Sequence, residues 1–514
     1  MNVIIEADMR PLSMSPPTPA ETQKSAELKA YLESLGLFEN KDEVAHREEL
    51  LESLQNICRD SVRDILTAKN AFSNQTPKEL ASLYTFGSFR MKINEPSADV
   101  DTMCVGPEYV SRDEFFDIAS ARLRNNPGVS DLSVIPDAFV PIITMKYGGI
   151  EFDLSYAPIA RYPSRLPLDF DILDDNNLKN VDEKTVRSLN GRRVTDTILK
   201  CVPNKTGRTF LQVLKAFRYW ARRRGVYKNV MGYLGGVNCS LFCAYAAMLY
   251  PQAAPAVVLY HCFRIFAEWK WPKPVLIRDV ESKPELNQDM NVWNPEKVEK
   301  DRMDLFPLLT PCYPSQNSTY TVMPSTRDVM TKEFARARDV VERVLQDKAV
   351  KWSELFREVP FFKEYKYYIQ VEVTASNAED FNAWFGYVES QIRKLVPIME
   401  ANHAITTHLL AKSFAPPGRD FCKQFYIAFA PKKDSTETTL DFTAATRHFK
   451  NNLLAHFEGV QDCDIAFNFL RNTSKVNELP DFLFPEGKQL RHRRKRVQST
   501  ESEAKKPKLE WTAS

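Results

Sequence analysis

Apolar positions recur at helical spacing over the first 70 residues. Between 20 and 35 they fall three and four residues apart, which predicts a helix, with Thr22 as a candidate cap. The stretch 41–70 repeats the pattern and predicts a longer helix. Residues 1–19 are rich in Pro and Ser and are expected to be flexible. The apolar stripes consist of Leu28, Tyr31, Leu32 and Leu35 in the first helix and Leu50, Leu51, Leu54, Ile57, Val62 and Ile65 in the second.

The pattern changes to short runs of β-branched and aromatic residues between 81 and 160. A helical pattern over 111–124 interrupts them. This mixture predicts an α+β or α/β sheet domain. The strand-like runs are 83–89, 99–105, 139–148 and 150–158.

Helical periodicity returns between 205 and 350, with loops that contain Gly and Pro between the helical segments. These residues therefore predict a helical middle domain. Its expected helices lie within 209–227, 240–250, 256–271 and 326–346.

A third pattern begins near residue 353 and follows the order strand, helix, strand, strand, helix, strand. This is the order of the ferredoxin-like fold, which RNA-recognition modules also use. Beyond 486 the chain turns polar and basic, without core-forming residues, and is predicted to be disordered. The expected elements are 365–373, 380–400, 407–414, 421–431, 443–460 and 462–470.

Composition excludes several classes of protein. The 514 residues are 43% hydrophobic and 26% charged, as in ordinary globular proteins, and no stretch of 18 apolar residues predicts a membrane span. Nine scattered cysteines and no secretory signal predict reduced thiols. A zinc site at Cys239, Cys243, His261 and Cys262 is the alternative, but the helix that carries the first two cysteines is apolar all round, which favours buried thiols.

Two aspartates mark the sharpest local feature of the sequence. Asp99 and Asp101 stand two apart in a predicted strand, so their carboxylates point to one face while Val100 points into the core. Paired carboxylates suit a divalent cation such as Mg²⁺. The dipeptide Gly87-Ser88, whose serine stands eleven residues before Asp99, predicts a turn that permits close approach to a phosphate.

A third acid is expected from the strand 150–158. Its apolar residues alternate with Glu151 and Asp153, so both acids lie on the polar face and both are candidates. With Asp153, three carboxylates would support a two-metal mechanism. The alternative is that the acids pair with Arg or Lys on a solvated face.

Further along, Lys215, Arg218 and Arg222 recur at helical spacing, which predicts a basic stripe suited to phosphates or an ordinary solvated face.

With these residues in place, the sequence resembles a known family. FGSF, nine residues, DVD and a distant strand aspartate are similar to the DNA polymerase β-like nucleotidyltransferase superfamily. The blocks SLNGRRVTDTIL, RYWARRRGVYKNVMGYLGGVNCSLFCAYAAMLYP and EWKWPKPVLI resemble the eukaryotic nuclear poly(A) polymerases more closely. The resemblance extends from about residue 20 to 480.

The resemblance implies an α+β multidomain protein with a nucleotidyltransferase palm, a helical middle domain, a ferredoxin-like (RRM-like) C-terminal domain and a disordered basic tail. The implied domains are 1–19 flexible N-terminus, 20–45 helices packing with the middle domain, 46–165 catalytic domain, 166–350 middle domain, 351–486 RRM-like domain and 487–514 basic tail.

It also implies roles for individual residues. Asp99, Asp101 and Asp153 would be the catalytic carboxylates and would bind two Mg²⁺ or Mn²⁺ ions. Arg218 stands where the family usually has a Lys that contacts the triphosphate; Arg keeps the charge but is bulkier and always protonated. The residues implied to bind ATP are Phe86, Gly87, Ser88, Asn190, Arg218, Tyr227, Asn229, Gly236, Val237 and Thr310.

The implied activity is template-independent transfer of AMP from ATP to the 3′-hydroxyl of (pre-)mRNA, making poly(A) tails. The alternatives are a terminal uridylyltransferase or other RNA-tailing enzyme of the superfamily, and a catalytically inactive RNA-binding scaffold. The expected partners are ATP, single-stranded RNA 3′ ends and subunits of the cleavage and polyadenylation complex, with no membrane contact, and the protein is expected to be a monomer.

In the third domain, Tyr367, Tyr368, Phe425, Tyr426 and Phe429 are candidates to stack bases, but at least half are expected in the core, with RNA contacts mainly from Lys and Arg.

Charge is unevenly distributed. The whole chain carries +2, but residues 488–514 hold nine Lys and Arg against three Glu, so the preceding body is net negative. Two basic clusters in this tail resemble a bipartite nuclear localisation signal, which predicts a nuclear protein, with an RNA-binding tail as the alternative. The clusters contain Arg491, Arg493, Arg494, Lys495 and Arg496, then Lys505, Lys506 and Lys508.

Overall fold

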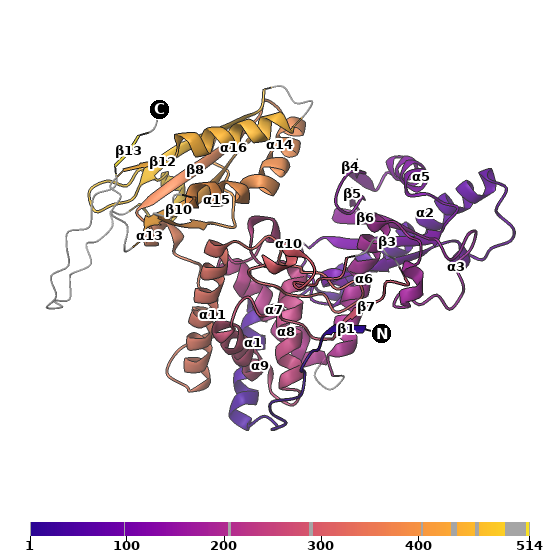
Figure 1. Cartoon of the computed structure of the whole chain (residues 1–514), viewed down its shortest axis with the longest axis horizontal. Helices are drawn as coiled ribbons and strands as arrows, with labels where there is room; N and C mark the ends of the chain where they lie inside the picture. Colours follow the sequence, from indigo (N-terminus) through magenta and orange to yellow (C-terminus); the bar gives the residue numbers. More distant parts are fainter. Residues whose placement is uncertain are drawn as a thin grey trace. The chain divides into compact units, whose positions relative to one another are not determined.

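Figure 1 shows the computed structural model of the chain, in which the mixed helix and sheet architecture is apparent. The chain divides into two compact units: the first comprises 1–219, 236–318 and 337–355, and the second comprises 220–235, 319–336 and 356–514. The structure describes residues 2–96, 98–203, 207–286, 291–401, 405–432, 439–457, 462–488 and 510–512. The basic clusters at 491–496 and 505–508 lie outside these residues.

The first unit begins with a short strand that the sequence did not predict. β1 (Asn2–Ile5) pairs antiparallel with β7 (Val280–Ser282), and the amide of Leu12 donates to the carbonyl of Leu249. Ile4 and Ile5 pack against a small core that includes Leu309. The expectation of a flexible segment over 1–19 is therefore wrong for residues 2–5, because their apolar side chains find a distant partner.

Helix α1 (Pro19–Ser34) follows and packs on α9 (Pro255–Glu268). Its cap is Thr18 rather than Thr22: Thr18 accepts from the amide of Glu21, and the Glu21 side chain accepts from the amide of Thr18. This reciprocal capping box satisfies two amides that the helix leaves unpaired. Helix α2 (Lys41–Ala68) is one long helix, as predicted.

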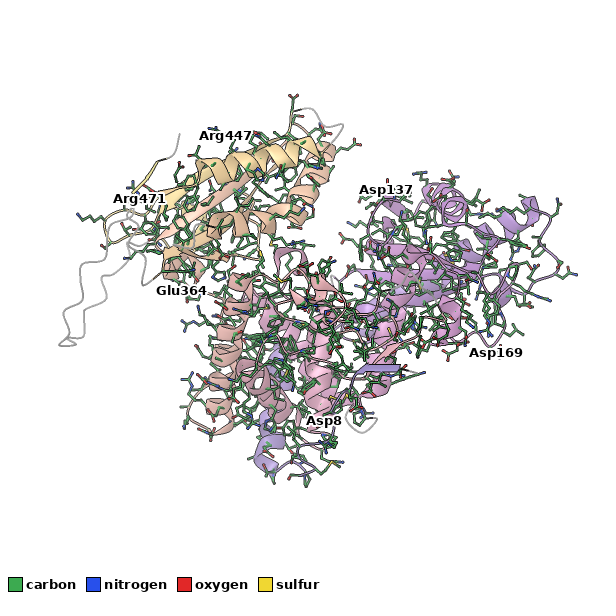
Figure 2. All side chains as sticks on the ribbon, in the orientation of Figure 1. Asp8, Asp137, Asp169, Glu364, Arg447 and Arg471 are labelled. Atoms are coloured by element: carbon green, nitrogen blue, oxygen red, sulfur yellow. The ribbon has the colours of Figure 1, made fainter. Side chains whose placement is uncertain are left out.

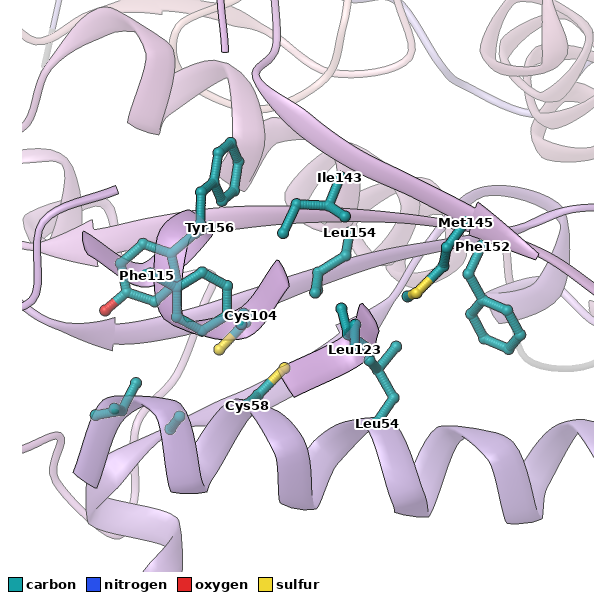
Figure 3. Close-up of a cluster of buried hydrophobic side chains, with 14 of the residues drawn as sticks. Leu54, Cys58, Cys104, Phe115, Leu123, Ile143, Met145, Phe152, Leu154 and Tyr156 are labelled. Carbon is teal, nitrogen blue, oxygen red and sulfur yellow. The ribbon is translucent and has the colours of Figure 1, made fainter. Parts of the chain in front are cut away.

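A five-stranded sheet lies in the first unit, with its strands in the order β2-β3-β6-β5-β4. Helices α2 and α5 (Arg112–Arg124) cover one face; Leu54 and Cys58 of α2 point toward the strands, and Phe115 of α5 stacks on Tyr156 with ring centroids 4.1 Å apart (Figure 3). Within this sheet, β4 is the strand that the sequence pattern did not predict. The strands are β2 (Ser82–Thr85), β3 (Val100–Pro107), β4 (Val129–Ile135), β5 (Ile142–Tyr147) and β6 (Ile150–Ile159).

The helical middle part contains the four predicted helices and a further long helix. Helix α6 (Glu183–Cys201) was not predicted, because it has few apolar residues and buries polar ones such as Arg193 and Thr195. Phe217 of α7 stacks on Phe263 of α9 within the apolar core. The predicted helices are α7 (Gly207–Arg223), α8 (Gly236–Leu249), α9 and α11 (Pro324–Leu345).

The second unit contains a four-stranded antiparallel sheet in the order β12-β8-β10-β9. Along the chain, helices follow the first strand, β8, and the third strand, β10. This is the predicted ferredoxin-like, RRM-like topology. The elements are β8 (Tyr367–Thr374), α14 (Ala378–Gln391), α15 (Leu395–Glu400), β9 (Ile405–Leu409), β10 (Cys422–Pro431), α16 (Thr443–Ala455) and β12 (Asp464–Arg471).

Both faces of this sheet are covered over much of their area. On one face, Phe425 stacks on Phe385 of α14. On the other, Tyr368 and Tyr426 lie in a cluster with Phe361 and Leu479. Next to that cluster, the Tyr426 hydroxyl joins the buried side chains of Gln370 and Gln424 by hydrogen bonds of 2.8 and 2.7 Å.

The aromatic candidates for base stacking are therefore mostly core residues, as the sequence indicated. Tyr368, Phe425, Tyr426 and Phe429 are buried, and only Tyr367 is partly exposed. Basic side chains remain at the surface: Arg447 and Arg471 lie on the outside of this domain (Figure 2).

Short elements complete the described chain. No described helix is both long and apolar enough to cross a membrane, and all nine cysteines are free. The short elements are α3 (Pro77–Leu80), α4 (Gly87–Arg90), α10 (Glu299–Arg302), α12 (Trp352–Leu355), α13 (Phe361–Glu364), β11 (Thr439–Asp441), β13 (Glu510–Thr512), η1 (Asp175–Leu178), η3 (Asn229–Met231), η4 (Ile392–Lys394) and η5 (Asp481–Leu483).

Candidate active site

Two central strands of the first unit bring acids from distant parts of the chain together. β3 and β6 run parallel, and their register pairs Asp101 with Asp153. Both side chains point to the same face, because residues paired across a sheet share a face. The Thr102 hydroxyl, which donates to the carbonyl of Asp153 at 2.7 Å, ties the two strands together beside the acids.

Asp99 completes a group of three carboxylates. Oxygens of Asp99, Asp101 and Asp153 all lie within 4.8 Å of one another. Val100 between the two aspartates is fully buried, as the strand alternation predicted. Of the two candidates on β6, the structure brings Asp153 into this group and leaves Glu151 exposed outside it.

The electrostatics of the group favour a cation. Burial, together with the charges of Asp99 and Asp153, raises the pKa of Asp101 to about 7, while Arg218 opposes the shift. Burial, with the charges of Asp99 and Glu151, raises the pKa of Asp153 to about 6. Half-buried carboxylates that repel one another are the hard oxygen ligands that divalent ions such as Mg²⁺ prefer. The residues present therefore fit a divalent metal.

The turn before α4 fits closely around Asp101. Gly87 adopts φ +58°, and a Cβ added there would lie 2.5 Å from Oδ2 of Asp101. The position thus requires glycine both for its backbone conformation and for its missing side chain. The amide of Gly87 donates to the Thr195 hydroxyl on α6 at 3.2 Å, and Ser88 follows as the second residue of α4.

Helix α6 forms a second wall of the site. The ring of Phe86 lies so close to Gly191 that a Cβ there would be 2.8 Å from a ring carbon. The neighbouring Asn190 has a buried side-chain oxygen, Oδ1, that accepts no hydrogen bond from the described residues. An unsatisfied buried oxygen of this kind is expected where a ligand supplies the donor.

The basic stripe predicted on α7 is only partly realised. Arg218 lies near enough to Asp101 to lower the pKa of that carboxyl. Lys215 is buried instead: its Nζ donates to the carbonyl of Leu37 at 2.6 Å and lies 3.9 Å from the ring centroid of Phe38. Arg222 lies over the Tyr227 ring at 6.0 Å. The prediction that Lys215 faces phosphates is therefore wrong.

The other predicted residues lie on several elements. Gly236 and Val237 begin α8, and the Thr310 hydroxyl accepts from the amide of Gln316. Tyr227 and Asn229 belong to the second unit, and Asn229 begins η3. Among the described residues, Cys239, Cys243, His261 and Cys262 do not form a metal-ligand group, so the zinc alternative is not supported.

Two supporting residues escaped the sequence analysis. Thr195 holds Gly87, and Asp196 accepts from both Arg90 of α4, at 2.8 Å, and Arg192 of α6, at 2.6 Å. Together they fix the glycine turn to α6. Neither contact belongs to a pattern that one sequence reveals, because Gly87 lies 108 positions from Thr195 and Arg90 lies 106 positions from Asp196.

Comparison with known proteins agrees with this arrangement. Three family models match consecutive segments: the poly(A) polymerase nucleotidyltransferase domain over 9–202, the poly(A) polymerase central domain over 209–358 and the poly(A) polymerase predicted RNA binding domain over 360–419. A solved structure of the Cid1 poly(U) polymerase bound to MgGTP aligns with 66% of this chain and all of that one, at 14% identity and a TM-score of 0.46.

Curated relatives match nearly the full chain. Nuclear poly(A) polymerase 1 of Arabidopsis thaliana is 36% identical over 93% of this chain and 66% of its own length. Poly(A) polymerase of Dictyostelium discoideum is 34% identical over 97% of this chain and 62% of its own length. The chain thus spans about two thirds of the length of these relatives. With all three family models matched in order, the chain belongs to the poly(A) polymerase family.

Proposed function

We propose that this protein is a template-independent polynucleotide adenylyltransferase that transfers AMP from ATP to the 3′-hydroxyl of single-stranded RNA. The observation that carries the proposal is the group Asp99, Asp101 and Asp153 in a member of the poly(A) polymerase family. These three residues would hold two divalent ions, Mg²⁺ or Mn²⁺, which activate the attacking hydroxyl and neutralise the triphosphate.

The side chains around the acids would position the reactants rather than react covalently. Gly87 leaves room for the carboxylate of Asp101, and Arg218 places a positive charge on the side where a triphosphate would bring negative charge. Asn190 offers its buried oxygen to a hydroxyl of the nucleotide sugar or of the RNA end. Phe86, packed on Gly191, presents a ring for the adenine. Catalysis would thus come from positioning and charge neutralisation.

The remaining assignments to the nucleotide site extend this proposal. Ser88 would line the phosphate turn with Gly87, and further contacts to the nucleotide are assigned by resemblance to Tyr227, Asn229, Gly236, Val237 and Thr310. Their support is the resemblance of the surrounding sequence blocks to the family. Each of these assignments can be tested by substitution of the residue with alanine, or with valine in the case of Gly236, followed by measurement of the KM for ATP.

The test is incorporation of single nucleotides onto a labelled RNA primer. Wild-type protein should add AMP from ATP with Mg²⁺ or Mn²⁺, and Asp101→Ala should abolish the product while circular dichroism and the melting temperature show an intact fold. Glu151→Ala is the matched control on the same sheet and should keep its activity. Full activity of Asp101→Ala would overturn the metal assignment, and a preference for UTP would favour the uridylyltransferase alternative. Failure of the wild-type protein with every nucleotide would favour an RNA-binding scaffold.

The cellular setting forms part of the proposal. Curated relatives include proteins named nuclear poly(A) polymerases, and the tail carries the two basic clusters. We therefore propose a nuclear protein, active as a monomer and recruited by subunits of the cleavage and polyadenylation complex. Deletion of 488–514 should shift the protein toward the cytoplasm and spare catalysis on short primers; a fully nuclear truncated protein would contradict the localisation signal.

A further inference from the structure

A cavity in the first unit lies apart from the three carboxylates. Its volume is about 410 Å³, which falls within the range of small-molecule sites. The C-terminal half of α6 lines one side, residues 171–175 another, and residues 278–283 with the loop 311–315 the rest. None of Asp99, Asp101 and Asp153 lines it.

The floor of the cavity holds two buried cations, Arg193 and Lys283, that are paired with the carboxylates of Asp175 and Glu281. Arg193 is only 1% exposed; it pairs with Asp175 and donates to the carbonyl of Ile172 at 2.7 Å. Its Nε is buried and has no hydrogen-bond partner among the described residues. Lys283 is also buried and pairs with Asp175 and Glu281. An arginine held rigidly with one buried donor unsatisfied is expected where a ligand supplies an acceptor.

The rim carries cations that the protein does not neutralise. Lys200 and Arg278 line the cavity, and neither forms an ion pair with a described residue. The two rim carboxylates are engaged with backbone amides instead: Asp171 accepts from Leu173 and Asp279 accepts from Ala7. Such carboxylates can still accept hydrogen bonds from ligand hydroxyls, but they disfavour a polyanion.

We propose that this cavity binds a phosphomonoester that carries several hydroxyl groups, with a size up to that of a nucleoside monophosphate. Lys200 and Arg278 hold the phosphate at the rim, the Nε of Arg193 donates to an acceptor of the ligand at the floor, and Asp171 accepts from a hydroxyl. A planar guanidinium can bind a phosphate through two parallel hydrogen bonds. The site stands on these residues alone and does not depend on the proposed polymerase activity.

Isothermal titration calorimetry on the full chain, in EDTA, tests the proposal with three probes: ribose 5-phosphate, AMP and inorganic phosphate. Ribose 5-phosphate has no base or triphosphate to direct it to the nucleotide site. We expect it or AMP to bind, and Arg278→Gln to weaken the binding about tenfold or more, because a hydrogen bond between charged groups is lost. Arg218→Gln, beside the carboxylates, is the matched control and should leave the binding of ribose 5-phosphate unchanged.

Alkylation of Cys201 locates the bound probe. Cys201 lines the cavity and is partly exposed, whereas Cys463, also partly exposed, belongs to the second unit. Peptide mass spectrometry after iodoacetamide treatment should show Cys201 protected several-fold by the probe and Cys463 unaffected. The protection should disappear in Arg278→Gln.

Three results would overturn the proposal. They are no binding of ribose 5-phosphate or AMP at millimolar concentration, binding that is unchanged in Arg278→Gln, and binding of inorganic phosphate alone. Should Cys201 prove unreactive in the free protein, the calorimetric comparison of the two arginine variants decides by itself. Arg278 is exposed, so its substitution is not expected to prevent folding, and a melting curve verifies this.

Discussion

The missing side chain of Gly87 leaves the space that the carboxylate of Asp101 occupies, since a Cβ at Gly87 would lie 2.5 Å from Oδ2 of Asp101. Two segments that are 14 residues apart in the chain are thereby fitted to each other at the group of three carboxylates. The fit makes the glycine turn a sensitive position for activity.

Gly87→Ala should lower kcat/KM for ATP by about 100-fold or more, because displacement of a reacting group by about 1 Å costs that much. The stability cost should be small, about 1 kcal/mol, from the strained backbone at φ +58°. Gly149→Ala is the matched control: Gly149 also has positive φ, +85°, but open space around its Cβ position. Primer extension and thermal melting separate the two effects, and equal activity losses in both variants would contradict the steric explanation.

Asp101→Asn should stabilise the protein in EDTA by at least about 1 kcal/mol, because it removes a buried charge from a group of repelling carboxylates. Wild-type protein should melt at higher temperature when Mg²⁺ or Mn²⁺ is added, and the variant should lose that response. Glu151→Gln, outside the group, should keep it. A cation response of Asp101→Asn equal to that of the wild type would show that the ions bind elsewhere.

Arg218 and Lys215 should behave differently although they are three residues apart on α7. Arg218→Ala should raise the KM for ATP about tenfold or more, and Arg218→Lys should restore most of the affinity, because the charge matters more than the shape there. Lys215→Met should lower the melting temperature and leave the KM unchanged, since Lys215 bonds the carbonyl of Leu37. A KM defect in Lys215→Met of the size seen in Arg218→Ala would contradict these positions.

Stability of the C-terminal domain should fall in mild acid because of His408. Burial, with the charges of Lys332 and Arg224, lowers the pKa of His408 from 6.5 to about 3. Between those pH values the unfolded chain binds a proton that the folded domain excludes, so the free energy of unfolding falls by about 1.4 kcal/mol per pH unit as the pH decreases below 6.5.

A variant pair isolates this contribution. His408→Gln should flatten the decline of stability between pH 7 and pH 5, measured by urea unfolding of the second unit, while His448→Gln on the exposed face of α16 should not. An unchanged pH profile in His408→Gln would assign the decline to other groups.

The sequence could bring Asp99 and Asp101 to one face because strand alternation is local. Asp99 and Asp101 needed only the two-residue period, and Val100 is buried as that period requires. The choice between Asp153 and Glu151 needed the register of β6 against β3, which depends on distant residues.

The errors come from contacts between distant segments. Lys215 fitted a basic stripe, but helical spacing cannot show that its turn faces the loop at Leu37. β1 was missed because its partner lies about 280 residues away, and α6 was missed because its buried face holds Arg193, Thr195 and Asp196, whose partners lie on other elements. The spacing of apolar residues along the sequence cannot reveal a helix whose buried face consists largely of polar side chains.

The parallel register of β3 and β6 also restricts how this chain can change in length. A single inserted or deleted residue within either strand would turn Asp101 or Asp153 from the metal-binding face into the apolar core, because successive side chains alternate between faces. The turn at 148–149 between β5 and β6 is an exposed end of the sheet, where extra residues leave that alternation intact. Natural variation in length should therefore accumulate at such connections and be absent from the two strands that carry the carboxylates.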